Sequence, residues 1–355
     1  MADPICKVAD IVFVRFELTD LEAQKEYLQH FGMHLVAEVD DAIHFKGTGA
    51  DPFIYAATKG QQNRFVSAGY RVDARADLER LAEQFNVDIV PSTEPGGGEK
   101  VVLSDPDGLG VEVFFGMART AAPKQDAPAL NSGFDKPRQN RLQRFGKAAD
   151  EWQAHDGKLV YELTSKVMRL GHTAINVADP KKSMDWYANT LGFLISDNIV
   201  LPDGMVMGGF MRCDLGDTPA DHHTINITAL PPEKLEAHGS FGHAGFELTE
   251  SVDDLMAGHF HMKTVGKYAH EWGIGRHLLG SQMYDYWRDP AGFILEHWTD
   301  GDLLDASVPA VDASARDVIL AQYGPVVPSS FNLTMPHEKA EEVRETEPSM
   351  STLFL

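Results

Sequence analysis

Residues 175–193, INVADPKKSMDWYANTLGF, hold the signals of a strand, a helix and a second strand in one short run. The alternating strand ends at Asp179, whose side chain is suited to cap the N-terminus of a helix, and Pro180 then takes the first helical position. Gly192 stands where this helix would end, because glycine readily adopts the left-handed conformation common after helices. The segment therefore predicts a helix over 180–191 between two strands.

The same pattern occurs twice in the chain. The paired landmarks are FELTD at 16–20 and INVAD at 175–179, SAGY at 67–70 and HAGF at 243–246, and DPDG at 105–108 and DPAG at 289–292. Within each copy the expected order is strand, helix, strands, strand, helix, strands. The predicted fold class is therefore α+β, with two tandem domains that are each a pair of βαβββ modules.

The repeat also divides the chain into segments. It places an N-terminal domain over 8–117 and a C-terminal domain over 168–300. Residues 118–167 are too many for a simple turn and are interpreted as a linker, and residues 301–355 form a tail. The chain length of 355 residues agrees with this division, since a domain has roughly 150 residues.

Composition and charge limit the partners of the chain. Hydrophobic residues make up 43% and charged residues 24%, which excludes a disordered or fibrous protein. The formal net charge of −22, with no basic patch, argues against nucleic acid and against an anionic membrane surface as partners. No apolar stretch is long enough to span a bilayer. We expect a cytoplasmic protein with a neutral or weakly charged small-molecule ligand and with Cys6 and Cys213 as reduced thiols.

Histidines are concentrated in the second copy of the repeat. Ten of the 15 lie between His172 and His297, where an even spread would place about five. This enrichment suggests metal or acid–base chemistry. Among the ten, His259, His261 and His270 are interpreted as residues of a helix surface or a loop.

Alignment of the two copies singles out three polar positions. The second copy has His172, His243 and Glu296 where the first has Phe13, Ser67 and Glu112. Two imidazoles and one carboxylate form the ligand set of non-haem Fe(II) sites, which leave coordination positions open for substrate and dioxygen. We therefore expect a metal site in the second copy only, with the first copy as a scaffold and Glu112 as a remnant of the duplication.

The second copy resembles the type I extradiol catechol dioxygenases of the vicinal oxygen chelate superfamily. The resemblance rests on the segment around Leu170-Gly171-His172 and, more specifically, on one run near the end of the copy. That run contains Gly275-Arg276-His277, then Tyr286, Asp289-Pro290-Ala291-Gly292 and Glu296. One position departs from the family pattern: Asp285 stands where the family usually has an apolar residue. This difference affects the expected packing near Tyr286 and leaves the metal ligands unchanged.

The resemblance implies roles for individual residues. His172, His243 and Glu296 would hold Fe(II), with Mn(II) also suited to these ligands, and no other cofactor is expected. The pair His222-His223 resembles the family's acid–base histidine. We assign that role to His223, and to His222 if the register is shifted by one residue. Two further catalytic residues, His277 and Tyr286, would line the pocket and hydrogen-bond to the substrate oxygens.

The implied activity is cleavage of the ring of a small aromatic diol by O₂, giving a 2-hydroxymuconic semialdehyde-type product, as in the catabolism of aromatic hydrocarbons. The resemblance also implies a homo-oligomer without nucleic-acid or membrane partners. Two alternatives stay open. One is a 4-hydroxyphenylpyruvate dioxygenase-like oxygenase of 2-oxo acids. The other is a non-catalytic small-molecule-binding protein of the same superfamily.

Overall fold

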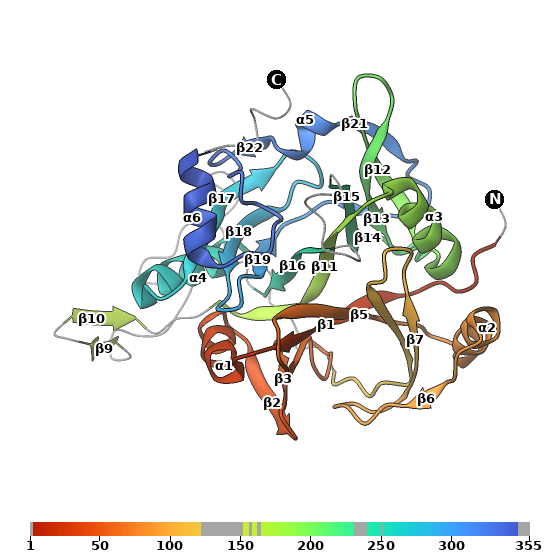
Figure 1. The fold of residues 1–355 in the computed structure, drawn as a ribbon, viewed down its shortest axis with the longest axis horizontal. Helices are drawn as coiled ribbons and strands as arrows, with labels where there is room; N and C mark the ends of the chain where they lie inside the picture. The colour runs from red at the N-terminus through yellow and green to blue at the C-terminus, as the bar shows by residue number, and fades with distance from the viewer. Residues whose placement is uncertain are drawn as a thin grey trace, which may run out of the picture.

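The structure is a computed structural model that describes residues 3–121, 152–155, 158–161, 165–230, 240–249 and 251–346. Within these ranges the chain forms two large sheets, one from each half of the sequence. Figure 1 shows the first half, coloured red to yellow, below the second half, coloured green to blue. In these ranges no helix has the length and apolar character needed to span a membrane.

The first sheet has eight strands in the order β2-β3-β4-β1-β5-β8-β7-β6. Their bounds are β1 (Asp10–Leu18), β2 (His34–Val39), β3 (Ala42–Lys46), β4 (Tyr55–Lys59), β5 (Arg64–Arg71), β6 (Val90–Pro91), β7 (Glu99–Ser104) and β8 (Gly110–Phe115). Two helices belong to this half, α1 (Leu21–His30) and α2 (Arg75–Phe85).

The second sheet has ten strands in the order β21-β12-β13-β15-β11-β16-β19-β18-β17-β22. Their bounds are β11 (Val167–Val177), β12 (Leu194–Val200), β13 (Val206–Arg212), β15 (Ile225–Ala229), β16 (Ser240–Leu248), β17 (Ala269–His277), β18 (Met283–Arg288), β19 (Ile294–Thr299), β21 (Val311–Ser314) and β22 (Ala321–Tyr323). Its helices are α3 (Pro180–Leu191) and α4 (Ser251–Val265). Two short pairs lie apart from it, β9 (Trp152–His155) with β10 (Lys158–Tyr161) and β14 (Ala220–Asp221) with β20 (Leu303–Leu304).

Strand pairing shows the duplication directly. β1 pairs in parallel with β4 and antiparallel with β5, and β11 pairs in the same way with β15 and β16. The parallel pair of β5 with β8 has its counterpart in β16 with β19. Each half therefore consists of two βαβββ modules, and the predicted fold class is confirmed. The domain boundaries at 8–117 and 168–300 stay a prediction.

The helix predicted from residues 175–193 forms with the predicted ends. The Asp179 carboxylate accepts a hydrogen bond from the backbone N–H of Lys182 at 3.0 Å, and Pro180 begins helix α3. Gly192 ends it in the left-handed conformation with φ 77°. Local capping chemistry alone therefore determines where this helix begins and ends.

Aromatic packing joins the two halves. The Phe16 ring on β1 lies 5.2 Å from that of Phe241 and 4.7 Å from that of Phe293, between ring centroids. Cys6 and Cys213 are buried and both free, as predicted from the sequence. Because the halves share apolar contacts along β1 and β11, the first half supports the sheet that carries the candidate site.

The tail closes both edges of the second sheet. β21 pairs with β12 at one edge and β22 pairs with β17 at the other. Between these two strands lies the short helix α5 (Ala315–Val318), and after them comes helix α6 (His337–Thr346). The sequence analysis assigned no role to residues 301–355, whereas the structure makes their described part a component of the C-terminal sheet.

Candidate metal centre

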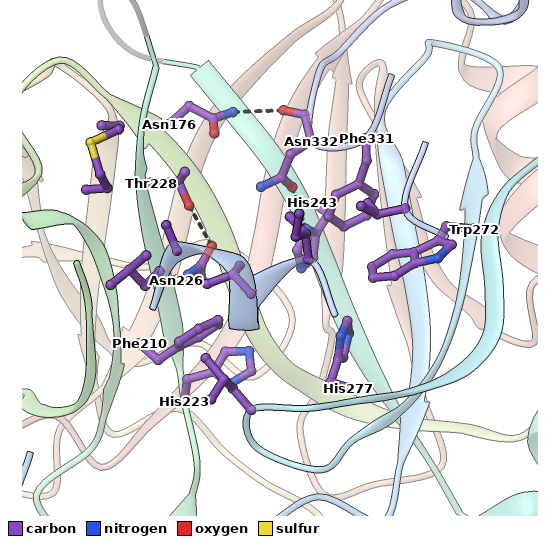
Figure 2. Close-up of a pocket in the computed structure, with 18 of the residues that line it drawn as sticks. Asn176, Phe210, His223, Asn226, Thr228, His243, Trp272, His277, Phe331 and Asn332 are labelled. Carbon is purple, nitrogen blue, oxygen red and sulfur yellow. Dashed lines mark hydrogen bonds between the residues drawn. The ribbon is translucent and has the colours of Figure 1, made fainter. Parts of the chain in front are cut away.

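A cavity lies against one face of the second sheet. Its wall combines strands of the sheet with residues of the tail (Figure 2). The lining residues are Asn176, Ile199, Met207, Phe210, His223, Asn226, Thr228, Ala229, Leu230, His243, Trp272, His277, Leu279, Gln282, Tyr286, Ala315, Val318, Ile319, Val327, Phe331 and Asn332. None of them is Lys, Arg, Asp or Glu, so the wall is apolar apart from amides, hydroxyls and imidazoles.

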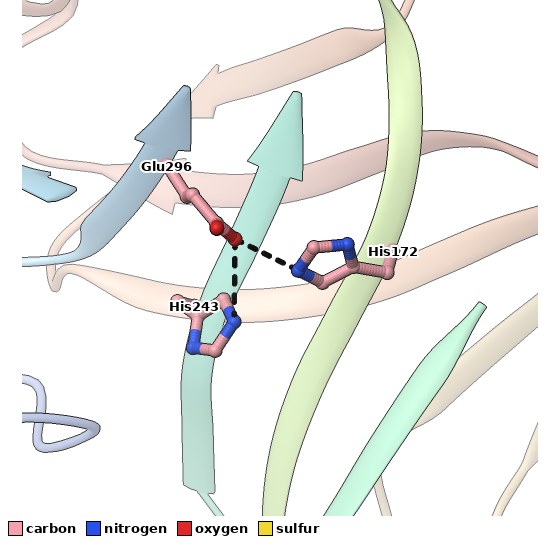
Figure 3. Close-up of side chains that lie close together, drawn as sticks. All are labelled: His172, His243 and Glu296. Atoms are coloured by element: carbon pink, nitrogen blue, oxygen red, sulfur yellow. Dashed lines mark ion pairs between the residues drawn. The ribbon is translucent and has the colours of Figure 1, made fainter. Parts of the chain in front are cut away.

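Three adjacent strands bring His172, His243 and Glu296 together. His172 lies on β11, His243 on β16 and Glu296 on β19. Their ligand atoms all lie within 4.8 Å of one another (Figure 3). The Glu296 Oε2 atom is 2.8 Å from Nε2 of His172 and 3.7 Å from Nε2 of His243. The structure therefore assembles the three residues that the repeat singled out.

A glycine between the strands leaves room for this cluster. Gly245 on β16 pairs with His172 on one side and with Glu296 on the other. A Cβ atom at Gly245 would lie 2.2 Å from Cε1 of His172 and 2.8 Å from Oε2 of Glu296. Any side chain here would displace the two residues, so the glycine of the HAGF segment is a steric requirement of the site.

The Glu296 carboxylate is fully buried, and within the described residues its ion-pair partners are histidines, with no Lys or Arg among them. Burial raises its pKa to about 8, and the neighbouring His243 and Tyr286 side chains offset this only in part. Burial also lowers the pKa of His172 to about 3 and that of His243 to about 4, which keeps both imidazoles neutral. Neutral imidazoles around an uncompensated carboxylate are the donor set that a divalent cation requires, so the residues fit a metal ion.

A residue of the tail orients one of the imidazoles. The Oδ1 atom of Asn332 accepts a hydrogen bond from Nδ1 of His243 at 2.7 Å. Since Nδ1 then carries the proton, the lone pair of Nε2 points toward the Glu296 carboxylate. Two facing lone pairs are favourable only around a cation, which supports the same interpretation of the cluster.

The two neighbouring histidines at 222 and 223 face different ways. His223 lines the cavity, with its ring centroid 4.3 Å from that of His172. His222 lies behind it, with Nε2 2.7 Å from Oδ2 of Asp197 and Nδ1 3.2 Å from Nδ1 of His223. Of the two registers left open by the sequence, the cavity wall favours His223, and its acid–base role stays a proposal.

His277 and Tyr286 form a pair in the opposite wall. The His277 Nε2 atom and the Tyr286 hydroxyl are hydrogen-bonded at 2.9 Å, and Nε2 is 4.0 Å from Oε1 of Glu296. Burial lowers the pKa of His277 and raises the pKa of Tyr286, so both are neutral. The structure thus places His223, His243, His277 and Tyr286 in the wall of one cavity, with His172 and Glu296 grouped around His243.

The aligned positions of the first half lack these properties. Glu112 accepts hydrogen bonds from Arg15 at 2.8 Å and from Lys100 at 2.6 Å, so two cations of the protein compensate its charge. Ser67 donates a further hydrogen bond to it, and Phe13 is buried. Here the remnant carboxylate takes part in an ordinary buried ion pair.

The sequence analysis missed several residues of the site. Val318, Ile319, Val327 and Phe331 of the tail cover the cavity beside Asn332. These tail residues were not predicted because they contact the site across a long separation in the chain. The Asp197–His222 pair was also missed, since it joins residues 25 positions apart.

The interpretation of His270 as a surface or loop residue is wrong. His270 lies in strand β17, and its Nε2 atom is 2.7 Å from Oδ1 of Asp285. His259 lies on helix α4 as expected, but its ring is turned toward the sheet and reaches the same carboxylate. Asp285, the residue that departs from the family pattern, therefore has two imidazole partners on the face of the sheet opposite the cavity.

Comparison with curated proteins identifies relatives of this chain. Residues 169–296 match the family model of the Glyoxalase/Bleomycin resistance protein/Dioxygenase superfamily. The chain is 27% identical over 338 residues to metapyrocatechase 2 of Cupriavidus necator, covering 93% of each protein. It is 23% identical over 284 residues to the manganese-dependent 2,3-dihydroxybiphenyl 1,2-dioxygenase of Geobacillus genomosp. 3, covering 77% of this chain and 79% of that protein. It is 22% identical over 312 residues to the iron-dependent extradiol dioxygenase of Rhodococcus jostii, covering 83% of this chain and 90% of that protein.

Solved structures share the fold. The Mn(II)-bound glyoxalase from Novosphingobium aromaticivorans superposes with a TM-score of 0.70 at 22% identity, covering 94% of this chain and 99% of that chain. Homoprotocatechuate 2,3-dioxygenase from Brevibacterium fuscum, in complex with 3,4-dihydroxyphenylacetate, superposes with a TM-score of 0.69 at 17% identity, covering 93% of each chain. The resemblance predicted from residues 275–296 is confirmed by these comparisons.

We predict that Glu296→Gln stabilises the metal-free protein near pH 8. The pKa of Glu296 is about 8 in the folded state against an ordinary 4.5, so its contribution to stability is present below pH 4.5 and is lost as the pH rises toward 8. The loss amounts to about 1.4 kcal/mol per pH unit. Urea unfolding with a chelator near pH 5 and near pH 8 measures the effect.

Glu112→Gln is the matched control, because its carboxylate has cationic partners. This variant should lower the free energy of unfolding near pH 8, whereas Glu296→Gln should raise it. Equal destabilisation by both substitutions would show that Glu296 is compensated within the protein.

Proposed function

Because residues 169–296 match the family model of the Glyoxalase/Bleomycin resistance protein/Dioxygenase superfamily, we propose that this protein is an extradiol dioxygenase. It would use O₂ to cleave the ring of a catechol-type substrate and give a 2-hydroxymuconic semialdehyde-type product. The proposal rests on one observation, a two-histidine, one-carboxylate cluster whose His243 lines an apolar cavity together with His223, His277 and Tyr286.

His172, His243 and Glu296 would hold the metal. A ferrous ion held there would supply a Lewis acid that lowers the pKa of a catechol hydroxyl and a redox-active centre for the reaction with O₂. We propose Fe(II) as the metal, with Mn(II) as the other ion that suits these ligands. Relatives named for their dependence on iron and on manganese support both options.

His277 and Tyr286 would orient the substrate. Their side chains meet in the cavity wall beside Glu296, and both are neutral hydrogen-bonding groups in a buried site. A hydrogen bond from the Tyr286 hydroxyl to a deprotonated catechol oxygen would stabilise its charge where water is excluded.

His223 would move the protons. Burial lowers its pKa, so its imidazole is neutral and able to accept a proton from the substrate hydroxyl. His222 stands behind it, with Asp197 on its far side, and this arrangement fixes the orientation of the His223 ring. A positioned general base of this kind contributes roughly 10²–10⁴-fold to the rate.

The lining of the cavity defines the substituent that the substrate can carry. The wall opposite the metal ligands contains apolar side chains from strands β12 and β13 and from helix α5, among them Ile199, Met207 and Val318. No lining residue is a Lys or Arg that could neutralise a carboxylate, and burial of an uncompensated charge is unfavourable. We therefore propose an uncharged catechol with an apolar substituent as the substrate.

A substrate panel under controlled metal loading tests the proposal. Apoprotein is reconstituted anaerobically with Fe(II) or Mn(II), and oxygen uptake and a yellow ring-opened product are followed with catechol, an alkyl- or aryl-substituted catechol and a carboxylated catechol. We expect the apolar catechols to turn over and the carboxylated one to react poorly. Oxygen uptake with a 2-oxo acid and none with catechols would overturn the proposal, and binding without any turnover would indicate a non-catalytic binding protein.

We predict that His223→Ala retains the metal and lowers kcat by about 10²–10⁴-fold. The side chain lines the cavity but belongs to no metal-ligand group of the described residues. Metal content and steady-state turnover are measured on the same preparation. His222→Ala is the comparison variant and should lose less activity. A fully active His223→Ala, or a larger loss with His222→Ala, would contradict the assignment.

We predict that Asn332→Ala weakens metal binding by about 10–100-fold without removing a ligand. The substitution deletes the hydrogen bond that orients His243. Competition with a calibrated chelator measures the affinity. Asn226→Ala is the control, since Asn226 lines the same cavity but hydrogen-bonds to Gly209 and Thr228 instead. Equal affinities of both variants would show that Asn332 does not orient a ligand.

A further inference from the structure

A second cluster of ligand-type side chains lies on the other face of the sheet. It consists of His259 on helix α4, His270 on strand β17 and Asp285 on strand β18. Successive side chains of a strand point to opposite faces, so Asp285 points away from the cavity that Tyr286 lines. A bulge between His270 and Trp272 places these two side chains on opposite faces as well.

The Asp285 carboxylate is fully buried and is held in one orientation. The Trp287 indole donates a hydrogen bond to Oδ2 at 2.6 Å. The other oxygen, Oδ1, lies 3.0 Å from Nδ1 of His259 and 2.7 Å from Nε2 of His270. Oδ1 thus faces two imidazole nitrogens, whereas Oδ2 accepts from the indole and also lies 3.1 Å from Nδ1 of His259.

This arrangement matches the first cluster in composition and spacing. Both clusters contain two imidazoles and one carboxylate, and in each the ligand atoms lie within 4.8 Å of one another. The two differ in access, because the side chains of His259 and His270 are 15% and 17% exposed whereas those of His172 and Glu296 are at most 1% exposed. A solvent ion can therefore reach the second cluster directly and keep water in its remaining positions.

We propose that His259, His270 and Asp285 form an accessory site for a divalent transition-metal ion of the Zn(II) type. Two imidazole nitrogens and one carboxylate oxygen leave one position of a tetrahedral zinc site for water. The Trp287 indole would hold the ligating carboxylate, as hydrogen bonds to metal ligands do elsewhere. Lys263 lies on helix α4, as His259 does, and its ammonium is 5.6 Å from the centroid of the Trp287 ring.

The bound ion would fasten helix α4 to the hairpin of β17 and β18. These strands also carry His277 and Tyr286 in the cavity wall, so the site would support that wall from behind. The proposal does not rest on the proposed function, because its residues and its face of the sheet are separate from the first cluster.

Zn(II) stoichiometry on the full chain tests the accessory site. Equilibrium dialysis against micromolar Zn(II), followed by elemental analysis, should find two ions in the wild type and one in His259→Gln. His172→Ala should also retain one ion, and the double variant should retain none. His34→Gln, a substitution on strand β2 of the first half, is the control and should retain two.

The outcomes separate the two sites. A single ion in the wild type that is lost in His172→Ala and kept in His259→Gln overturns the accessory site and leaves the proposed function intact. A single ion in the wild type that is lost in His259→Gln and kept in His172→Ala supports the accessory site. That result would show that the proposed function lacks its metal centre.

A second measurement needs no substitution in the accessory cluster. In His172→Ala, Zn(II) should shift the imidazole NMR signals of His259 and His270. Unchanged signals at saturating Zn(II) would overturn the proposal even if His259→Gln failed to fold.

Discussion

An uncompensated buried carboxylate is the constraint on which the site depends. Glu296 is fully buried, pairs with no Lys or Arg of the described residues and faces two neutral imidazoles. Such a group is unfavourable unless a cation joins it. The sheet holds it there through the register of three adjacent strands, with Gly245 opposite both His172 and Glu296.

The two halves of the molecule show what makes such a carboxylate functional. In the first half Arg15 and Lys100 pair with Glu112, and the positions of the two imidazoles are taken by Phe13 and Ser67. The fold of the two halves is the same, so the fold alone does not create the site. The difference is the source of positive charge, which the protein supplies in one half and a bound ion would supply in the other.

Local signals and the internal repeat predicted much of the molecule. Asp179 and Gly192 define helix α3 through interactions within a few residues, and the repeat aligned His172, His243 and Glu296 without any knowledge of the fold. Asn332 and the tail residues over the cavity were not predicted, because they are distant in sequence from the residues that they contact. Asn332 and His243, for example, are 89 positions apart. The partners of Asp285 were missed for the same reason, since two imidazoles from separate elements contact it only after the sheet has formed.

A crystal structure of the protein loaded anaerobically with Fe(II) tests the central claim most directly. One ion should lie about 2.0–2.2 Å from Nε2 of His172, Nε2 of His243 and one oxygen of Glu296, beside the cavity. If these three side chains surround no ion at full loading, or if Glu296 pairs with a protein cation as Glu112 does, the account of the site is contradicted.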